Sequence, residues 1–127
     1  IERHDKTTQE WLAFIRHFEG ELDKEKMITI DKQLNFKNSG NAEIMSEWFI
    51  LGIKNEYKDL RPDIKAFLIK VGRRKFLAPI YNALSKSIND AAWAKDVYEK
   101  ARPNYHAISF NTIDEILGVS YVKKAEN

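Results

Sequence analysis

The spacing of apolar side chains is the feature that most constrains the fold of this chain. Apolar residues recur at intervals of three and four, the period of one helix face, and no segment alternates convincingly with the period of two typical of a strand. The pattern predicts an all-α domain of about six to seven helices joined by tight turns, which favours antiparallel neighbours. The expected helical segments are 7–18, 23–34, 41–55, 62–71, 75–85, 89–101 and 111–118.

Residues that begin or end helices fall between these segments. Asn41 is expected to cap the third helix, and Pro62 suits the first turn of the fourth. Gly72 is expected to close the fourth helix in a left-handed conformation, and Asn111 to cap a short last helix that ends at Gly118. The third segment is apolar over most of its circumference, so we expect it to be the central, doubly covered helix. Periodicity leaves two architectures open, a compact bundle and a short two-layer solenoid.

Composition and charge narrow the class of protein. A chain of 127 residues with 43% hydrophobic and 12% aromatic residues is long enough for one folded domain and is not disordered. The absence of cysteine excludes disulfides and thiolate metal sites; it is compatible with the cytosol but fixes no compartment. A net charge of +2 is small for a nucleic-acid-binding domain, and no apolar run has the length of a membrane span. We therefore expect neither nucleic acid nor a membrane as partner.

The sequence offers few candidate catalytic or metal-ligating residues. Its histidines, His4, His17 and His106, have no metal-ligand spacing, and there is no signal peptide or glycine-rich phosphate loop. Glu43 and Glu47 stand one turn apart and could form a carboxylate pair, but an exposed charged face is the favoured interpretation. His106 is interpreted as a hydrogen-bonded packing residue rather than a ligand. We predict no catalytic residue and no metal or cofactor site in this chain.

One basic segment admits two interpretations. Residues 70–75, Lys-Val-Gly-Arg-Arg-Lys, place four cations at the junction of two predicted helices. Arg74 and Lys75 fall at the start of the fifth helix, where the helix dipole disfavours positive charge. Pro79 indicates that this helix has only just begun. Such an arrangement is typical of an anion-binding site at a helix N-terminus. The alternative is a solvated basic turn.

These residues also carry a resemblance. Gly-Arg-Arg-Lys-Phe at 72–76, followed by Pro79, resembles the Gly-Arg-x-Lys-Phe-x-x-Pro motif in the C-terminal helical domain of the leukotriene A(4) hydrolase family of zinc aminopeptidases. Upstream, Asn-Ala-Glu-Ile at 41–44 followed by Trp48 is similar to the family's Asn-x-Glu-Ile-x-x-x-Trp. Tyr98 and His106 fall where the family has a tyrosine and a histidine, without a gap. The similarity extends from about residue 7 to residue 118.

The resemblance implies that residues 1–127 are the single helical C-terminal domain of a larger zinc aminopeptidase, with ends at 1–6 and 119–127 expected to fray. It implies a two-layer αα-superhelix similar to armadillo repeats, which closes one side of the active-site cleft. Zinc and its ligands would lie in the N-terminal catalytic domain, the expected partner. Arg73 and Lys75 would bind the carboxylate of short peptide substrates.

Two other functions remain as alternatives. A stand-alone helical-repeat module could bind protein along a concave face, and the basic turn could bind nucleic acid, although the near-neutral charge disfavours the latter. The start at Ile1 rather than Met is compatible with a fragment of a longer protein.

Overall fold

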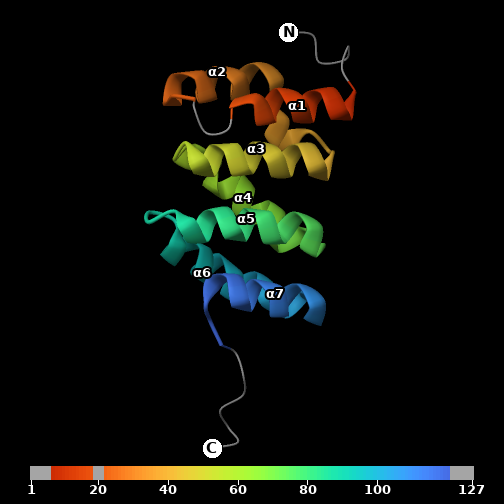
Figure 1. Cartoon of the computed structure of the whole chain (residues 1–127), viewed down its shortest axis with the longest axis vertical. Coiled ribbons are helices and arrows are strands. Elements are labelled where there is room, and N and C mark those ends of the chain that lie inside the picture. The colour runs from red at the N-terminus through yellow and green to blue at the C-terminus, as the bar shows by residue number, and fades with distance from the viewer. Residues whose placement is uncertain (1–6, 19–21, 121–127) are drawn as a thin grey trace, which may run out of the picture. The chain divides into compact units, whose positions relative to one another are not determined.

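The computed structural model describes residues 7–18 and 22–120, and every regular element in those ranges is helical. The prediction of an all-α chain with about seven helices is therefore confirmed (Figure 1). The α-helices are α1 (Thr8–Phe18), α2 (Lys24–Leu34), α3 (Ala42–Lys54), α4 (Arg61–Lys70), α5 (Arg74–Lys86), α6 (Ala91–Ala101) and α7 (Ala107–Leu117), and the short 3₁₀ turns are η2 (Phe36–Asn38), η3 (Lys58–Leu60) and η4 (Arg102–Asn104).

The chain divides into two units, residues 1–67 and 68–127, with the boundary inside α4. In the first unit α3 packs against α1 and against both neighbouring 3₁₀ turns. Most of α3 is buried, as the apolar circumference predicts. Its core is aromatic: the Phe36 ring lies 5.2 Å from Trp11 and 5.4 Å from Trp48 between centroids. Such tilted and edge-on pairs add to the stability that burial provides.

Local capping starts α3 where the sequence predicts. The Asn41 side-chain oxygen accepts hydrogen bonds from the backbone N–H groups of Glu43 and Ile44, at 2.9 and 3.4 Å. These donors would otherwise lack a partner at the helix N-terminus. Further along α3, Gly52 permits a close approach to η3, because a Cβ there would stand 2.5 Å from a methyl carbon of Leu60.

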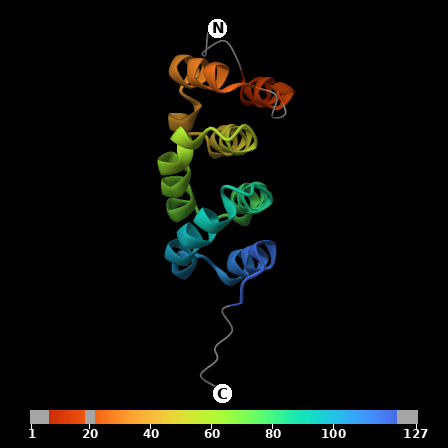
Figure 2. The same ribbon diagram turned by 90° about the vertical axis from the view of Figure 1, so that its left-hand side faces the viewer.

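In the second unit α5 packs against both α6 and α7, and Figure 2 shows α5 and α7 side by side. Each helix turns its apolar stripe inward, so the core of the unit is built from residues three and four apart. The buried side chains include Leu77, Ile80, Tyr81, Leu84, Ala94, Val97, Tyr98 and Ile113.

Several boundary predictions are wrong. Gly72 is not among the residues with positive φ, and α4 already ends at Lys70. The last helix starts at Ala107, so Asn111 lies inside it rather than at its cap. The start of the fifth helix, by contrast, is predicted to within one residue: α5 begins at Arg74, and Pro79 lies in its second turn.

The end of α7 agrees with prediction. Gly118 adopts the left-handed conformation, with φ +65°, and its N–H bonds to carbonyls of the last turn. Val119 donates its N–H to the Asp114 carbonyl at 3.0 Å, so the expected fraying does not begin at 119. Residues 1–6 and 121–127, where fraying was also expected, lie outside the described residues. Within the described ranges, no helix combines the length and apolar character that a membrane crossing requires.

Candidate functional site

The second unit carries an open depression where the α4–α5 junction meets the start of α7. The basic turn forms one wall, and the first turn of α7 with the residue before it forms the other. The lining residues are Gly72, Arg73, Arg74, Lys75, His106, Ile108 and Ser109. The predicted site residues Arg73 and Lys75 therefore lie in one depression, together with His106.

The backbone of the basic turn presents the N-terminus of α5 to this depression. Arg73 is the N-cap residue, with extended φ −79° and ψ 123°, and its side chain makes no capping hydrogen bond. The N–H groups of Phe76 and Leu77 bond to the Arg73 carbonyl, at 3.0 and 3.1 Å. In helix geometry, the N–H groups of Arg74 and Lys75 have no carbonyl to bond and form the positive end of the dipole.

The side chains add positive charge at the same place. Arg73, Arg74 and Lys75 are all exposed, and the first turn of α5 contains no acidic residue. Throughout the described ranges, no carboxylate lies within ion-pair distance of these three cations. The Arg73 guanidinium and the Lys75 ammonium each lie 5.6 Å from the centroid of the Phe76 ring, which supports both. The arrangement can bind an anion.

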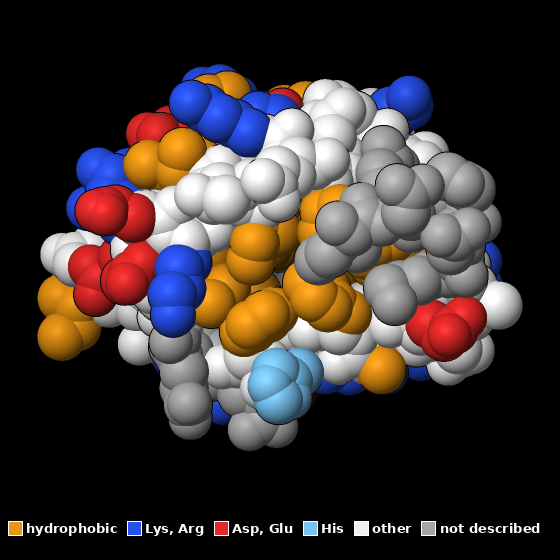
Figure 3. Space-filling model, turned by 90° about the horizontal axis from the view of Figure 1, so that it is seen from above, with side chains coloured by type: hydrophobic (Ala, Val, Ile, Leu, Met, Phe, Trp, Pro, Cys, Tyr) orange, Lys and Arg blue, Asp and Glu red, His pale blue; other side chains and the backbone are white. Residues whose placement is uncertain are grey.

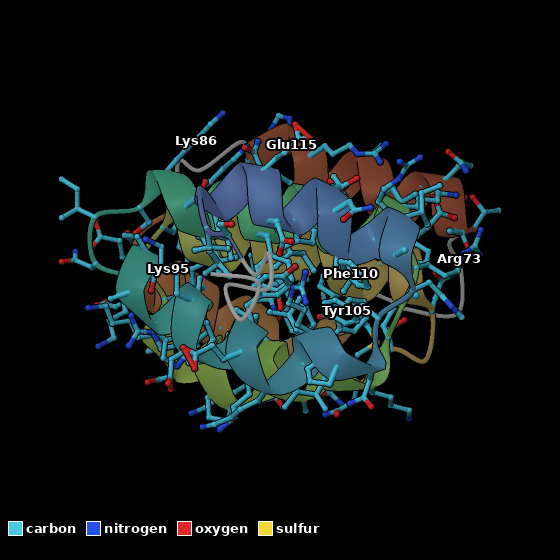
Figure 4. The ribbon with its side chains drawn as sticks, turned by 90° about the horizontal axis from the view of Figure 1, so that it is seen from below. Arg73, Lys86, Lys95, Tyr105, Phe110 and Glu115 are labelled. Atoms are coloured by element: carbon cyan, nitrogen blue, oxygen red, sulfur yellow. The ribbon has the colours of Figure 1, made fainter. Side chains whose placement is uncertain are left out.

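Hydrogen bonds from residues 105–109 hold the backbone before and within the basic turn. The Tyr105 hydroxyl donates to the Leu68 carbonyl at 2.5 Å, in the last turn of α4, and therefore accepts from the Tyr81 hydroxyl at 3.0 Å. The Ser109 hydroxyl donates to the Gly72 carbonyl at 3.0 Å. Burial raises the pKa of Tyr105 to about 12, so its hydroxyl remains a donor at neutral pH. Figure 4 shows Tyr105 inside the unit and Arg73 at its edge.

A second polar cluster lies on α6, η4 and α7. Arg102 donates two hydrogen bonds to the Asp114 carboxylate, Nε–Oδ1 at 3.0 Å and NH2–Oδ2 at 2.8 Å. The Arg102 guanidinium also lies 4.2 Å from the centroid of the Phe110 ring. The Tyr98 hydroxyl hydrogen-bonds to Asp114 and to the Phe110 carbonyl, and burial followed by the Asp114 carboxylate raises the pKa of Tyr98. The two charged side chains of this cluster, Arg102 and Asp114, pair with each other, which indicates a structural role.

The other sequence candidates have separate outcomes. His106 is exposed at the N-cap of α7 and its side chain makes no capping hydrogen bond, so its interpretation as a hydrogen-bonded packing residue is wrong. Glu47 pairs with Arg16, Oε1 to Nε at 3.1 Å, and both Glu43 and Glu47 are only partly exposed, whereas an exposed face was expected. His4 lies outside the described residues. Within the part of the chain that the structure describes, no three His, Cys, Asp or Glu side chains are grouped to hold a metal ion.

Sequence reasoning missed Ile108, Ser109 and Tyr105. The Ser109–Gly72 and Tyr105–Leu68 bonds each join residues 37 positions apart, and no local pattern marks either partner. The one sequence feature that could have pointed to these three residues is His106, which the family resemblance singles out. It lies one residue from Tyr105 and two from Ile108.

Comparison with known proteins gives a consistent result. A profile of the family described as "Leukotriene A4 hydrolase, C-terminal" matches residues 6–117. Leucine aminopeptidase 2 of Ajellomyces capsulatus is 34% identical over 91 residues, which are 72% of this chain and 14% of the relative. The Neurospora crassa protein of the same name is 28% identical over 110 residues, 87% of this chain and 16% of that protein. Mouse aminopeptidase B is 30% identical over 81 residues, 63% of this chain and 12% of its own length.

This chain thus spans only about a seventh of the relatives that it matches. The match nevertheless covers nearly the whole chain, including both wall segments of the depression. With its all-helical fold, the chain belongs to the leukotriene A4 hydrolase C-terminal domain family.

Proposed function

We propose that residues 1–127 form the C-terminal accessory domain of a zinc aminopeptidase, and that Arg73 and Lys75 bind the C-terminal carboxylate of its short peptide substrates. One observation carries the proposal: two cations without an acidic partner among the described residues stand at the N-terminus of α5 and line one depression. The names of the relatives, leucine aminopeptidase 2 and aminopeptidase B, supply the class of reaction.

The chemistry of the two side chains suits a carboxylate. The Arg73 guanidinium can donate two parallel hydrogen bonds to the two carboxylate oxygens, whereas Lys75 supplies a compact charge. The unbonded N–H groups of the first turn add a third source of positive potential. Each charge-assisted hydrogen bond contributes about 1.5–3 kcal/mol. The domain would thus position the peptide, while zinc in the catalytic domain would supply the hydrolytic chemistry.

An interface with the catalytic domain of the same protein is the second part of the proposal. On α1, Phe14 and Phe18 lie one turn apart, 5.3 Å between ring centroids, and both are only half-buried. In Figure 3, viewed from the end where α1 and α2 lie, hydrophobic side chains gather near the centre of the surface, and Lys, Arg, Asp and Glu side chains lie to its left. A partner domain could cover such a surface.

The test uses the full-length aminopeptidase and tripeptides with a free or amidated C-terminus. Replacing Arg73 or Lys75 by alanine should lower kcat/KM for the free acids by about 10- to 100-fold, the equivalent of one charge-assisted hydrogen bond. The loss should nearly vanish with the amides, because they present no anion.

Lys86→Ala is the matched control. Lys86 is an exposed cation in the last turn of the same helix, and Figure 4 places it on the opposite side of the unit from Arg73. This variant should leave both activities unchanged. Equal losses on acids and amides for Arg73→Ala and Lys75→Ala would mean that the basic turn is structural, and the carboxylate assignment would fail.

A further inference from the structure

Ile108 is an exposed isoleucine in the depression beside the basic turn. It lies in the first turn of α7 and is 62% exposed, although isoleucine is among the residues most often buried. Two other large hydrophobic residues of the described ranges are exposed, Ile69 at 36% and Ile88 at 96%, and neither lines the depression. The feature to be explained is therefore an isoleucine that faces solvent beside the basic turn.

The position of Ile108 relative to the basic turn is set by its neighbour in the chain. Ser109 is 2% exposed and its hydroxyl donates to the Gly72 carbonyl at 3.0 Å. The Ser109 N–H bonds to the His106 carbonyl at 2.9 Å, which forms the first turn of α7. These two bonds place the backbone of residue 108 against the residue that precedes Arg73. Ile108 is thus held next to the cations.

Peptide chemistry connects this position with the substrate. The carboxylate and the side chain of a peptide's last residue are both bonded to the same α-carbon. When Arg73 and Lys75 hold the carboxylate, that side chain therefore starts from an α-carbon at the depression, within reach of its lining residues. Ile108 is the aliphatic side chain among the lining residues. A substrate side chain the size of leucine can pack against it, and the apolar surface that both then remove from water stabilises the contact.

We propose that Ile108 is a specificity-determining residue that contacts the side chain of the substrate's C-terminal residue, and that the enzyme prefers peptides ending in an apolar residue. The proposal rests on the carboxylate site proposed above. A hydrophobic pocket distinguishes side chains that differ by one methylene about tenfold or more. On an open wall with a single isoleucine we expect a preference for leucine over alanine of about five- to tenfold in kcat/KM.

The test uses the full-length enzyme with tripeptides identical except for a C-terminal leucine or alanine, each as free acid and as amide. The wild-type enzyme should prefer the leucine acid about five- to tenfold, and Ile108→Ser should reduce that ratio to near one. Ile108→Val, which keeps an aliphatic side chain, should retain most of the preference. Ile88→Ser is the matched control: Ile88 is 96% exposed in the same unit and outside the depression, so the ratio should not change.

The acid and amide arms separate this proposal from the one on which it rests. If Ile108→Ser keeps the wild-type leucine-to-alanine ratio, or the wild type shows no preference, the role of Ile108 is overturned even though acids remain favoured over amides. If the wild type does not distinguish acids from amides, the carboxylate site fails and this inference fails with it. Thermal unfolding of each variant checks that the domain remains folded, as expected for substitutions at exposed positions.

Discussion

Asp114 illustrates how one residue can hold two others in the second unit. Its carboxylate accepts two hydrogen bonds from Arg102 and one from Tyr98, and it is largely removed from solvent. Burial alone would raise the pKa of Asp114, but the hydrogen bonds from Arg102 and Tyr98 together with the Arg102 charge lower it below its usual 3.8. The charged form of Asp114 is therefore more favoured in the folded than in the unfolded state.

The first prediction follows from the sign of that shift. A group whose pKa is lower in the folded state stabilises the fold above its unfolded-state pKa, and this contribution disappears as the pH falls through the folded-state pKa. At pH 7 we expect Asp114→Asn to lower the free energy of unfolding by about 1–3 kcal/mol, through loss of charge-assisted hydrogen bonds. The difference from wild type should shrink below pH 3.8. Urea unfolding at pH 7 and at a pH well below that value measures both quantities.

The matched control is Asp96→Asn. Asp96 lies on the same unit and pairs with Lys100 at 3.8 Å, but both side chains are more than half exposed. Exposed pairs of this kind contribute little, so this variant should differ little from wild type at either pH. A difference between Asp114→Asn and wild type that stays constant with pH would contradict the proposed linkage.

At the scale of elements, the contact between α3 and η3 depends on the missing side chain of Gly52. A Cβ at Gly52 would stand 2.5 Å from Leu60 Cδ1, and Leu60 is fully buried and cannot move away into solvent. The packed core would have to shift, which costs about 1–3 kcal/mol and exceeds the gain of about 1 kcal/mol from the higher helix propensity of alanine. We therefore expect Gly52→Ala to lower the melting temperature.

Gly72→Ala is the comparison variant for this prediction. Nothing lies within 4 Å of a Cβ built at Gly72, and its φ is outside the left-handed region. We expect this substitution to leave the melting temperature nearly unchanged, contrary to what a left-handed helix cap at Gly72 would imply. A melting temperature lowered more by Gly72→Ala than by Gly52→Ala would contradict the described packing.

At the scale of the whole molecule, each unit has a buried apolar core of its own. We expect the isolated 127-residue chain to fold, with a far-UV circular dichroism spectrum dominated by helix and a cooperative loss of that signal on heating. Since the proposed function assigns the zinc and the hydrolytic chemistry to the catalytic domain, we expect the pure chain not to hydrolyse an aminoacyl chromogenic substrate in the presence of zinc. Zinc-dependent hydrolysis by the pure chain would refute the assignment of the chemistry to another domain.

The sequence by itself determined the helices and several of their ends. Apolar spacing identified the first six helical segments, because the period of a helix is a local property, whereas the seventh was placed from Asn111 and Gly118 and only its end was correct. The Asn41 cap followed from a side chain that bonds N–H groups two and three residues ahead, and Arg74 and Lys75 were correctly placed in the first turn of α5. The start of α7 was misplaced because no capping side chain marks it. Its N-cap residue, His106, makes no side-chain hydrogen bond to the helix N-terminus.

Only the tertiary structure decided what surrounds the basic turn. The bonds from Ser109 to Gly72 and from Tyr105 to Leu68 connect residues far apart in the chain, and they form because α5 and α7 pack against each other. The same packing leaves Ile108 exposed in the depression and buries Ser109, its neighbour. The packing of α7 against α5 decides which side chain of α7 faces solvent beside the basic turn. Local interactions along the chain do not determine this packing, because it brings together residues far apart in the sequence.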